Sequence, residues 1–151
     1  MQRWIVIGII ALALAFGGGA FGYWSYRQHR PDKVWVPLPL NPALGEDQRA
    51  KAAAELKTKL ESDEILTRVC TDLSLADKWK LSSTDAAKAE VKKRLFVEIG
   101  EVALNGTTAP SANVGVTGIR KERQLLGEIS THLIKEVWKI LGIKPPPGQG
   151  I

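Results

Sequence analysis

The pattern of hydrophobic and polar positions begins with a long apolar run. From Trp4 to Tyr26 the chain contains no Asp, Glu, Lys or Arg. About 20 consecutive apolar residues are enough for a helix to cross the hydrocarbon core of a bilayer. Trp4 at one end, and Tyr23 with Trp24 at the other, are typical of interfacial aromatic belts. A cleavable signal peptide, with Ala20-Phe21-Gly22 as its cleavage site, is the alternative. We expect an uncleaved transmembrane anchor over residues 1–26 and a juxtamembrane linker over residues 27–33.

Small residues recur at helical spacing inside this run. Gly18 and Gly22 form a GxxxG pair, and Ala11, Ala15 and Gly19 lie four apart on one helix face. Such residues let membrane helices approach closely, so we expect them to form a helix-packing face. The alternative is that glycine and alanine are simply common in apolar helices.

After the linker, the pattern changes to strand alternation. Val34, Val36, Leu38 and Leu40 alternate with other residues and share one face. The run also contains Pro37 and Pro39, which are two apart, so both missing N–H groups lie along the same edge. This arrangement predicts an edge strand, because a central strand needs donors on both sides.

Helical periodicity dominates the rest of the chain. The range Glu46–Glu61 is rich in Ala, Lys, Glu and Leu, and a second helix follows Ser62, which we expect to act as its N-cap. A third helix begins around Ser82–Asp85, and the longest runs from Arg120 to Leu141. The buried positions that this periodicity predicts are Ala53, Leu56, Leu60, Ile65, Leu66, Val69, Cys70, Leu73, Ala87, Val91, Leu95, Leu126, Ile129, Leu133, Val137 and Ile140.

Two further strands lie between the third and the last helix. Leu95, Val97 and Ile99 alternate, and the apolar phase then shifts at Gly100, which predicts a β-bulge there. Asn105-Gly106 is a strong turn signal. Residues 107–111 lengthen the connection, and residues 112–119 alternate again, so the two segments predict an antiparallel hairpin.

The element order strand, helix, helix, helix, strand, strand, helix predicts an α+β domain. In this fold class a small sheet is packed by helices, in a ferredoxin-like or related arrangement. We place the domain at residues 34–142, after the transmembrane helix, and a Pro/Gly-rich tail at residues 143–151.

Composition and motifs predict no catalytic chemistry. The net charge is +5, but basic and acidic residues are interleaved without basic–aromatic alternation, so we expect no nucleic-acid partner. The single cysteine, Cys70, has no partner for a disulfide or a CxxC site and is predicted to be a buried structural thiol. His29 and His132 are far apart, and no HExxH or nucleophile motif occurs. We therefore expect no enzyme, metal or cofactor.

One stretch resembles a known family. Leu60-Glu-Ser-Asp-Glu-Ile-Leu66, then Val69 and Leu73-Ser-Leu75, lead to Trp79, and Leu95-Phe-Val97 follows. This pattern resembles the base domain of Wzz-type polysaccharide co-polymerases, the chain-length determinant proteins. The resemblance implies an inner-membrane protein with a periplasmic domain, which forms homo-oligomers around a membrane polymerase and has no cofactor. The family's long coiled-coil insertion and second transmembrane helix are missing here.

These observations predict a non-enzymatic, membrane-anchored assembly protein of the cell envelope. It would act in surface polysaccharide biosynthesis or export, with the membrane, its own copies and other envelope proteins as partners. The alternative is a single-pass subunit of a secretion or pilus assembly machine. We expect it in the bacterial inner membrane with its domain in the periplasm. The basic residues argue the other way, because Arg3 precedes the helix while Arg27, Arg30 and Lys33 follow it.

Overall fold

The structure is a computed structural model that describes residues 22–104 and 106–142. Residues 22–28 are helical and lead into the first strand. The elements that follow are β1 (Pro31–Pro39), α2 (Glu46–Leu60), α3 (Asp63–Asp72), α4 (Leu75–Lys78), α5 (Thr84–Arg94), β2 (Leu95–Leu104), β3 (Thr107–Ile119), η1 (Arg120–Glu122) and α6 (Arg123–Leu141). The α+β part of the predicted fold class is therefore confirmed.

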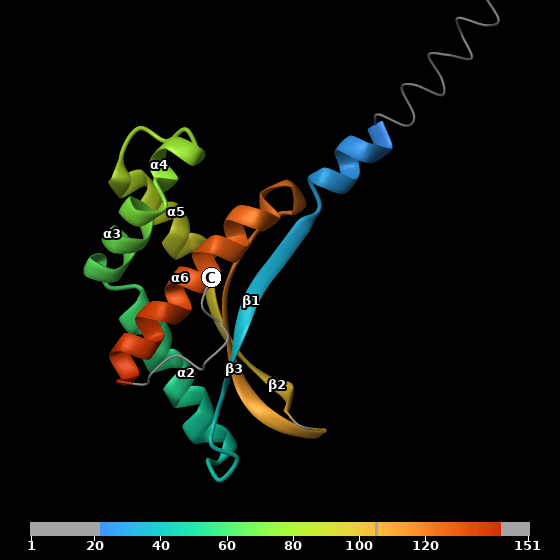
Figure 1. Cartoon of the computed structure of the whole chain (residues 1–151), viewed down its shortest axis with the longest axis vertical. Helices are drawn as coiled ribbons and strands as arrows, with labels where there is room; N and C mark the ends of the chain where they lie inside the picture. Colours follow the sequence, from blue (N-terminus) through green and yellow to red (C-terminus); the bar gives the residue numbers. More distant parts are fainter. Residues whose placement is uncertain (1–21, 105, 143–151) are drawn as a thin grey trace, which may run out of the picture.

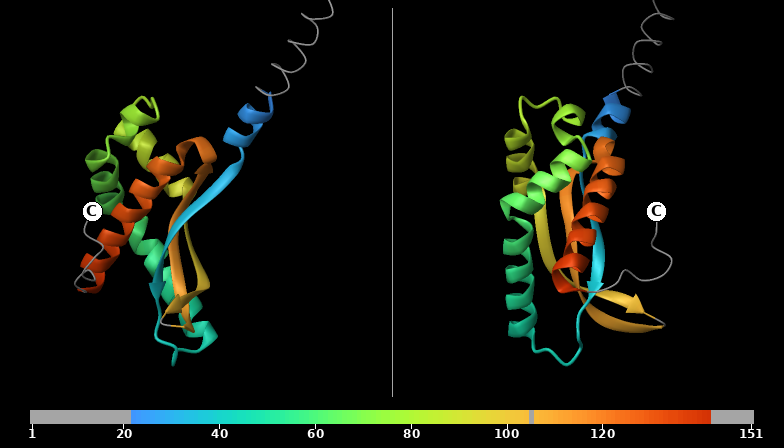
Figure 2. Two further views of the ribbon diagram at one scale, coloured as in Figure 1. Left: turned by 45° about the vertical axis from the view of Figure 1, so that its right-hand side comes forward. Right: turned by 60° about the vertical axis from the view of Figure 1, so that its left-hand side comes forward.

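The three strands form one antiparallel sheet in the order β1-β3-β2. Helices cover one face of this sheet, with α6 packed on β1 and β3 and α2 packed on β2 (Figure 1). The two other views show the same layering, with α3, α4 and α5 stacked beside α6 at the end of the domain where residues 22–28 enter (Figure 2). The prediction that residues 34–40 form an edge strand is confirmed, because β1 pairs only with β3.

The core lies between the helices and the covered face of the sheet. Val114 and Val116 of β3 are almost fully buried, as is Leu95 of β2. The largest helical side chains with no or almost no exposure are Leu60, Val69, Leu75, Val91, Leu126, Ile129, Leu133 and Val137. Most of these were predicted from helical periodicity, since the apolar stripe of a surface helix faces the core.

A close backbone contact at Gly115 holds β1 against β3. A Cβ atom at Gly115 would lie 2.1 Å from the carbonyl oxygen of Val34 and 2.7 Å from Cα of Trp35. Gly115 pairs with Trp35 in the ladder, so glycine is required there for the strands to approach. On the covered face, the buried hydroxyl of Ser130 in α6 lies 2.9 Å from the Val34 carbonyl oxygen, to which it can donate.

Several local predictions need correction. The register between β2 and β3 is continuous from Leu95↔Val116 to Leu104↔Thr107, so the bulge predicted at Gly100 is wrong. The far half of the hairpin curves away from the helices (Figure 1). There Glu101 and Ala103 on the covered face are exposed, while Val102 on the other face is half-buried, which accounts for the shift in apolar phase. β3 begins at Thr107 and not at residue 112. The start of the third predicted helix needs no correction, because α5 begins at Thr84 with Ser83 as its cap, which accepts from Ala86 N–H.

The membrane part of the prediction is also corrected. Residues 1–21, with Ala11, Ala15, Gly18 and Gly19, lie outside the described residues. Among residues 22–104 and 106–142, no helix is long and apolar enough to cross a membrane. Residues 22–28, where the described part of the chain begins, are helical and include Arg27 and Gln28. This finding contradicts the transmembrane helix in the predicted fold class and the single-pass inner-membrane location.

We predict that Gly115→Ala lowers the free energy of unfolding by about 1–3 kcal/mol, because the added methyl group forces β1 and β3 apart. Urea denaturation of the full chain measures this change. Gly127→Ala is the matched control, since a Cβ at Gly127 in α6 meets nothing within 4 Å. It should stabilise the protein by about 0.5–1 kcal/mol through helix propensity. Equal effects of the two substitutions would contradict the close approach at Gly115.

Candidate assembly interface

The two edges of the sheet differ in their free hydrogen-bonding groups. Leu40 N–H donates to Pro110 and Arg120 N–H donates to Arg30, which flank the β1–β3 ladder. In an antiparallel ladder alternate residues bond across the pair, so even-numbered residues of β1 face β3. The residues of β1 whose backbone groups point outward are Pro31, Lys33, Trp35, Pro37 and Pro39. Three of these five are prolines without an N–H, so β1 is a poor template for another strand.

The other edge, along β2, carries no proline. Even-numbered residues of β3 bond to β1, so its odd-numbered residues bond to even-numbered residues of β2. The backbone groups of Val97, Ile99, Glu101 and Ala103 therefore point outward. Among the described residues, none of these four amides has a hydrogen-bond partner. Such an edge is a ready template for strand addition.

A cleft borders this open edge. It has a volume of about 470 Å³ and lies between the start of α2 and the β2–β3 hairpin, where its lining includes Arg49, Ile99 and Glu101. Ile99 is 42% exposed, although its side chain is on the covered face of the sheet. The Arg49 guanidinium donates through Nη2 to the Pro42 carbonyl oxygen at 2.8 Å, but its Nε is buried without a partner.

The sheet face opposite the helices has its own polar link between the edges. Lys33 of β1 donates to Glu98 of β2 at 2.8 Å, and its ammonium lies 5.0 Å from the centroid of the Phe96 ring. This contact crosses β3 and pairs the charge of Glu98 within the chain. Trp35 lies on the same face, over Gly115, and is 48% exposed.

A second cleft, of about 490 Å³, lies at the opposite end of the domain. Trp79, Leu125 and Glu128 are among its lining residues. Trp79 is half-buried, with the Arg94 guanidinium 4.8 Å from its ring centroid. Lys78 donates to Glu128 at 2.9 Å and lowers the pKa of that carboxyl. The carboxylate of Glu128 in this cleft is therefore paired with a basic side chain.

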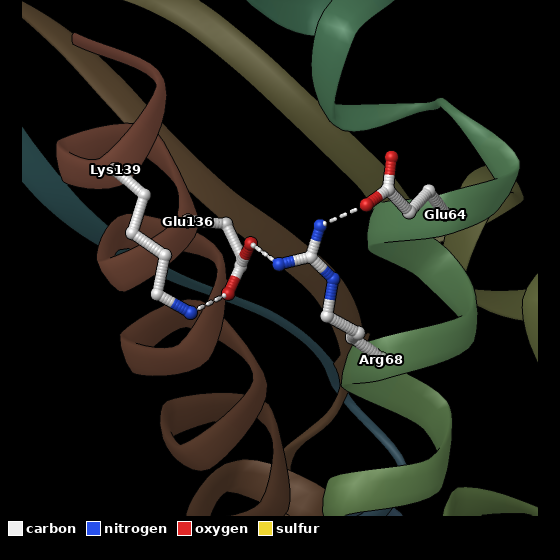
Figure 3. A network of polar contacts seen from close by, with 4 residues as sticks. All are labelled: Glu64, Arg68, Glu136 and Lys139. Atoms are coloured by element: carbon white, nitrogen blue, oxygen red, sulfur yellow. Dashed lines mark hydrogen bonds and ion pairs between the residues drawn. The ribbon is translucent and has the colours of Figure 1, made fainter. Parts of the chain in front are cut away.

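One charged cluster inside the domain joins two helices. Glu136 of α6 is 7% exposed and pairs through Oε2 with Arg68 of α3 at 3.1 Å, and Figure 3 shows Arg68 lying between Glu136 and Glu64. Lys139 pairs with the other oxygen of Glu136. Each charge has an opposite neighbour, so the cluster ties α3 to α6 and has no free group for chemistry.

We predict that Glu136→Gln lowers the free energy of unfolding by about 1–3 kcal/mol, because it removes the central partner of a partly buried network. Glu64→Gln is the control, since Glu64 is 80% exposed at its side chain. It should change stability by about 1 kcal/mol or less. Denaturation curves for both variants measure the difference, and a larger loss for Glu64→Gln would contradict the role given to Glu136.

Cys70 is buried in α3, as predicted from its helical position. Burial raises the pKa of its thiol to about 11, while the nearby positive charge of Lys88 acts in the opposite direction. The thiolate is the reactive form of cysteine, so Cys70 is an inert part of the core.

We predict that Cys70 in the folded full chain reacts with a thiol reagent far more slowly than in urea. At pH 8 a pKa of about 11 leaves only roughly one thiol in a thousand ionised, and the reagent must also reach a buried group. With an aromatic disulfide as the thiol reagent, the rate of labelling is measured from the absorbance of the chromophore that the reaction releases. Equally fast labelling in buffer and in urea would show that Cys70 is accessible.

The other residues considered in the sequence do not gather into a site. Gly22, the only described member of the predicted packing face, has open space where a Cβ would be. His29 shares a hydrogen bond through Nδ1 with the Ser25 carbonyl oxygen, and His132 lies on α6. Within the described ranges, no group of three His, Cys, Asp or Glu side chains could hold a metal ion.

Comparisons with known proteins add no relative. No protein-family model, no curated protein and no solved structure matches the chain. The similarity to Wzz-type co-polymerases therefore stays a prediction from the sequence.

Sequence reasoning missed the residues of the open edge. It treated Ile99 as a sheet residue and gave Arg49 no role. The available signal was the lack of proline in residues 95–104, beside the prolines of residues 31–39. That contrast distinguishes a blocked edge from an open one only when the strand order is known.

Proposed function

We propose that this chain is a non-enzymatic assembly protein, which joins protein subunits by adding a strand to the open edge of β2. The observation that carries the proposal is the row of outward backbone groups at Val97, Ile99, Glu101 and Ala103, which have no partner within the described residues. Strand addition gives affinity through main-chain hydrogen bonds and specificity through side-chain pockets.

The surroundings of the edge support this proposal. Ile99 contributes exposed apolar area beside the cleft, and burial of apolar area favours association. The Glu98 charge is paired with Lys33, so it repels an incoming strand less than a free carboxylate would. We expect the partners to include further copies of the chain. The role in surface polysaccharide biosynthesis that the resemblance implies remains a prediction.

We predict that Ile99→Pro weakens self-association of the full chain by about tenfold or more, because proline removes an outward donor and disfavours an added strand. The Ile99 amide does not bond to β3, so the β2–β3 ladder keeps its hydrogen bonds. Sedimentation velocity over a range of concentrations measures association, and circular dichroism checks the fold.

Trp35→Pro is the matched control for this experiment. Trp35 is also an outward residue, but on the edge that prolines already block. Its substitution should leave association unchanged. A chain that remains monomeric at all concentrations, or an equal effect of the two substitutions, would contradict assembly through the β2 edge.

A further inference from the structure

We infer that the strand added to β2 is the β2 strand of a second copy, paired antiparallel about a two-fold axis at Gly100, with Arg49 of each copy facing Glu101 of the other. This inference rests on the proposed function and names the partner and the register. It follows from three separate features of the edge: its free backbone groups, its charges and the space beside it.

The free backbone groups select the register. With the axis at Gly100, Ile99 pairs with Glu101 of the second copy and Val97 pairs with its Ala103. All four outward residues then enter hydrogen-bonded pairs with one another. With the axis at Ile99, Ala103 would instead face Leu95 of the second copy, whose N–H already donates to Val91 at the end of α5.

The acidic side chains of β2 exclude two further registers. An axis at Glu98 or at Glu101 would set two like carboxylates directly opposite each other, which destabilises a strand pair. With the axis at Gly100, Glu98 lies opposite Val102 of the second copy and Glu101 lies opposite Ile99. The carboxylate of Glu101 from one copy thus lies next to Ile99 of the other copy, at the cleft that this Ile99 lines together with Arg49 and Glu101 of its own chain.

Arg49 and Glu101 are both available for this contact. The Arg49 Nε is buried without a hydrogen-bond partner, and among the described residues neither Arg49 nor Glu101 forms an ion pair within its own chain. A carboxylate is the acceptor that suits a guanidinium best. The two-fold axis produces this contact twice.

The geometry at the axis also suits a close approach. Gly100 would face Gly100 of the second copy as a non-hydrogen-bonded pair, in which Cα atoms are about 4.5 Å apart. The Asn113 side chain already occupies the space over Gly100, since a Cβ there would lie 2.4 Å from Asn113 Nδ2. The hairpin curves away from the helix layer in this region (Figure 1), and the cleft lined by Ile99, Gly100 and Glu101 lies beside it.

The test uses charge reversal in two separate full-length chains. With Arg49→Glu alone, two carboxylates meet at each of the two contacts, and with Glu101→Arg alone, two guanidinium groups meet there. Each variant should therefore associate with itself about tenfold or more weakly than the wild type.

The mixture is decisive because the two-fold axis gives a mixed dimer one contact between the two substituted side chains and one between the two native side chains. Both of these contacts are between opposite charges, so a mixed dimer should form with nearly wild-type affinity. Sedimentation velocity with one labelled chain measures it.

Lys51→Glu and Glu55→Arg, two exposed positions on α2, are the controls because they change net charge by the same amounts. They should associate like the wild type, singly and mixed. If the mixture of Arg49→Glu and Glu101→Arg chains stays dissociated, or if neither variant weakens self-association, the inferred register is overturned. Ile99→Pro distinguishes failure of the inferred register from failure of the proposed function. If Ile99→Pro abolishes association while the charge variants do not behave as expected, the β2 edge remains the interface and only the register is overturned. If Ile99→Pro has no effect on association, the proposed function itself is overturned.

Discussion

The close approach of β1 to β3 at Gly115 is the contact on which the rest of the structure depends. β1 arrives directly from the N-terminal segment, whereas β3 and α6 come from the end of the domain. Without a side chain at Gly115, the backbone of Val34 and Trp35 lies against β3. The Val34 carbonyl oxygen is then within reach of the Ser130 hydroxyl on α6. Strand, strand and helix are thus fixed together by groups far apart in the sequence.

Among the described strands, this arrangement makes β3 the central one and leaves β1 and β2 as the two edges. A three-stranded sheet cannot remove its edges by closing into a barrel, because closure needs more strands. Along β1 the chain carries prolines at the outward positions, which remove donors without disturbing the ladder to β3. Along β2 it carries none. The helix layer does not close that side either, since the cleft beside α2 leaves Ile99 partly exposed.

Much of the fold could be predicted from the sequence, because its local signals agree with one another. Helical spacing located the buried faces of α3 and α6, and alternation with Pro37 and Pro39 identified β1 as an edge strand.

The prediction of a bulge at Gly100 was wrong because the apolar phase shift reflects curvature of the hairpin and not an extra residue in the ladder. The anchor over residues 1–26 was predicted from hydropathy and from the aromatic residues at its ends, and no described helix is long and apolar enough to cross a membrane. The candidate site was not predictable in the same way, because the free amides of β2 are defined by which strand lies beside β3. Local patterns encode which face of an element is buried, whereas strand order decides which edge is open.

The contrast between the two edges is itself an argument for a function at β2. Natural sheets protect exposed edges with proline, charge or a covering element. Here the charge that could protect β2 is paired, since Lys33 reaches across β3 to Glu98. The carboxylate of Glu101 is the remaining charge among the outward residues of β2 that has no ion pair within the described part of the chain. A free carboxylate at a sheet edge disfavours an added strand only if that strand's protein brings no basic group to pair with it. Because Arg49 lines the same cleft, the guanidinium of a second copy in the proposed dimer would make Glu101 an attractive group. The same residue can then disfavour unrelated strands and favour the pairing of identical chains.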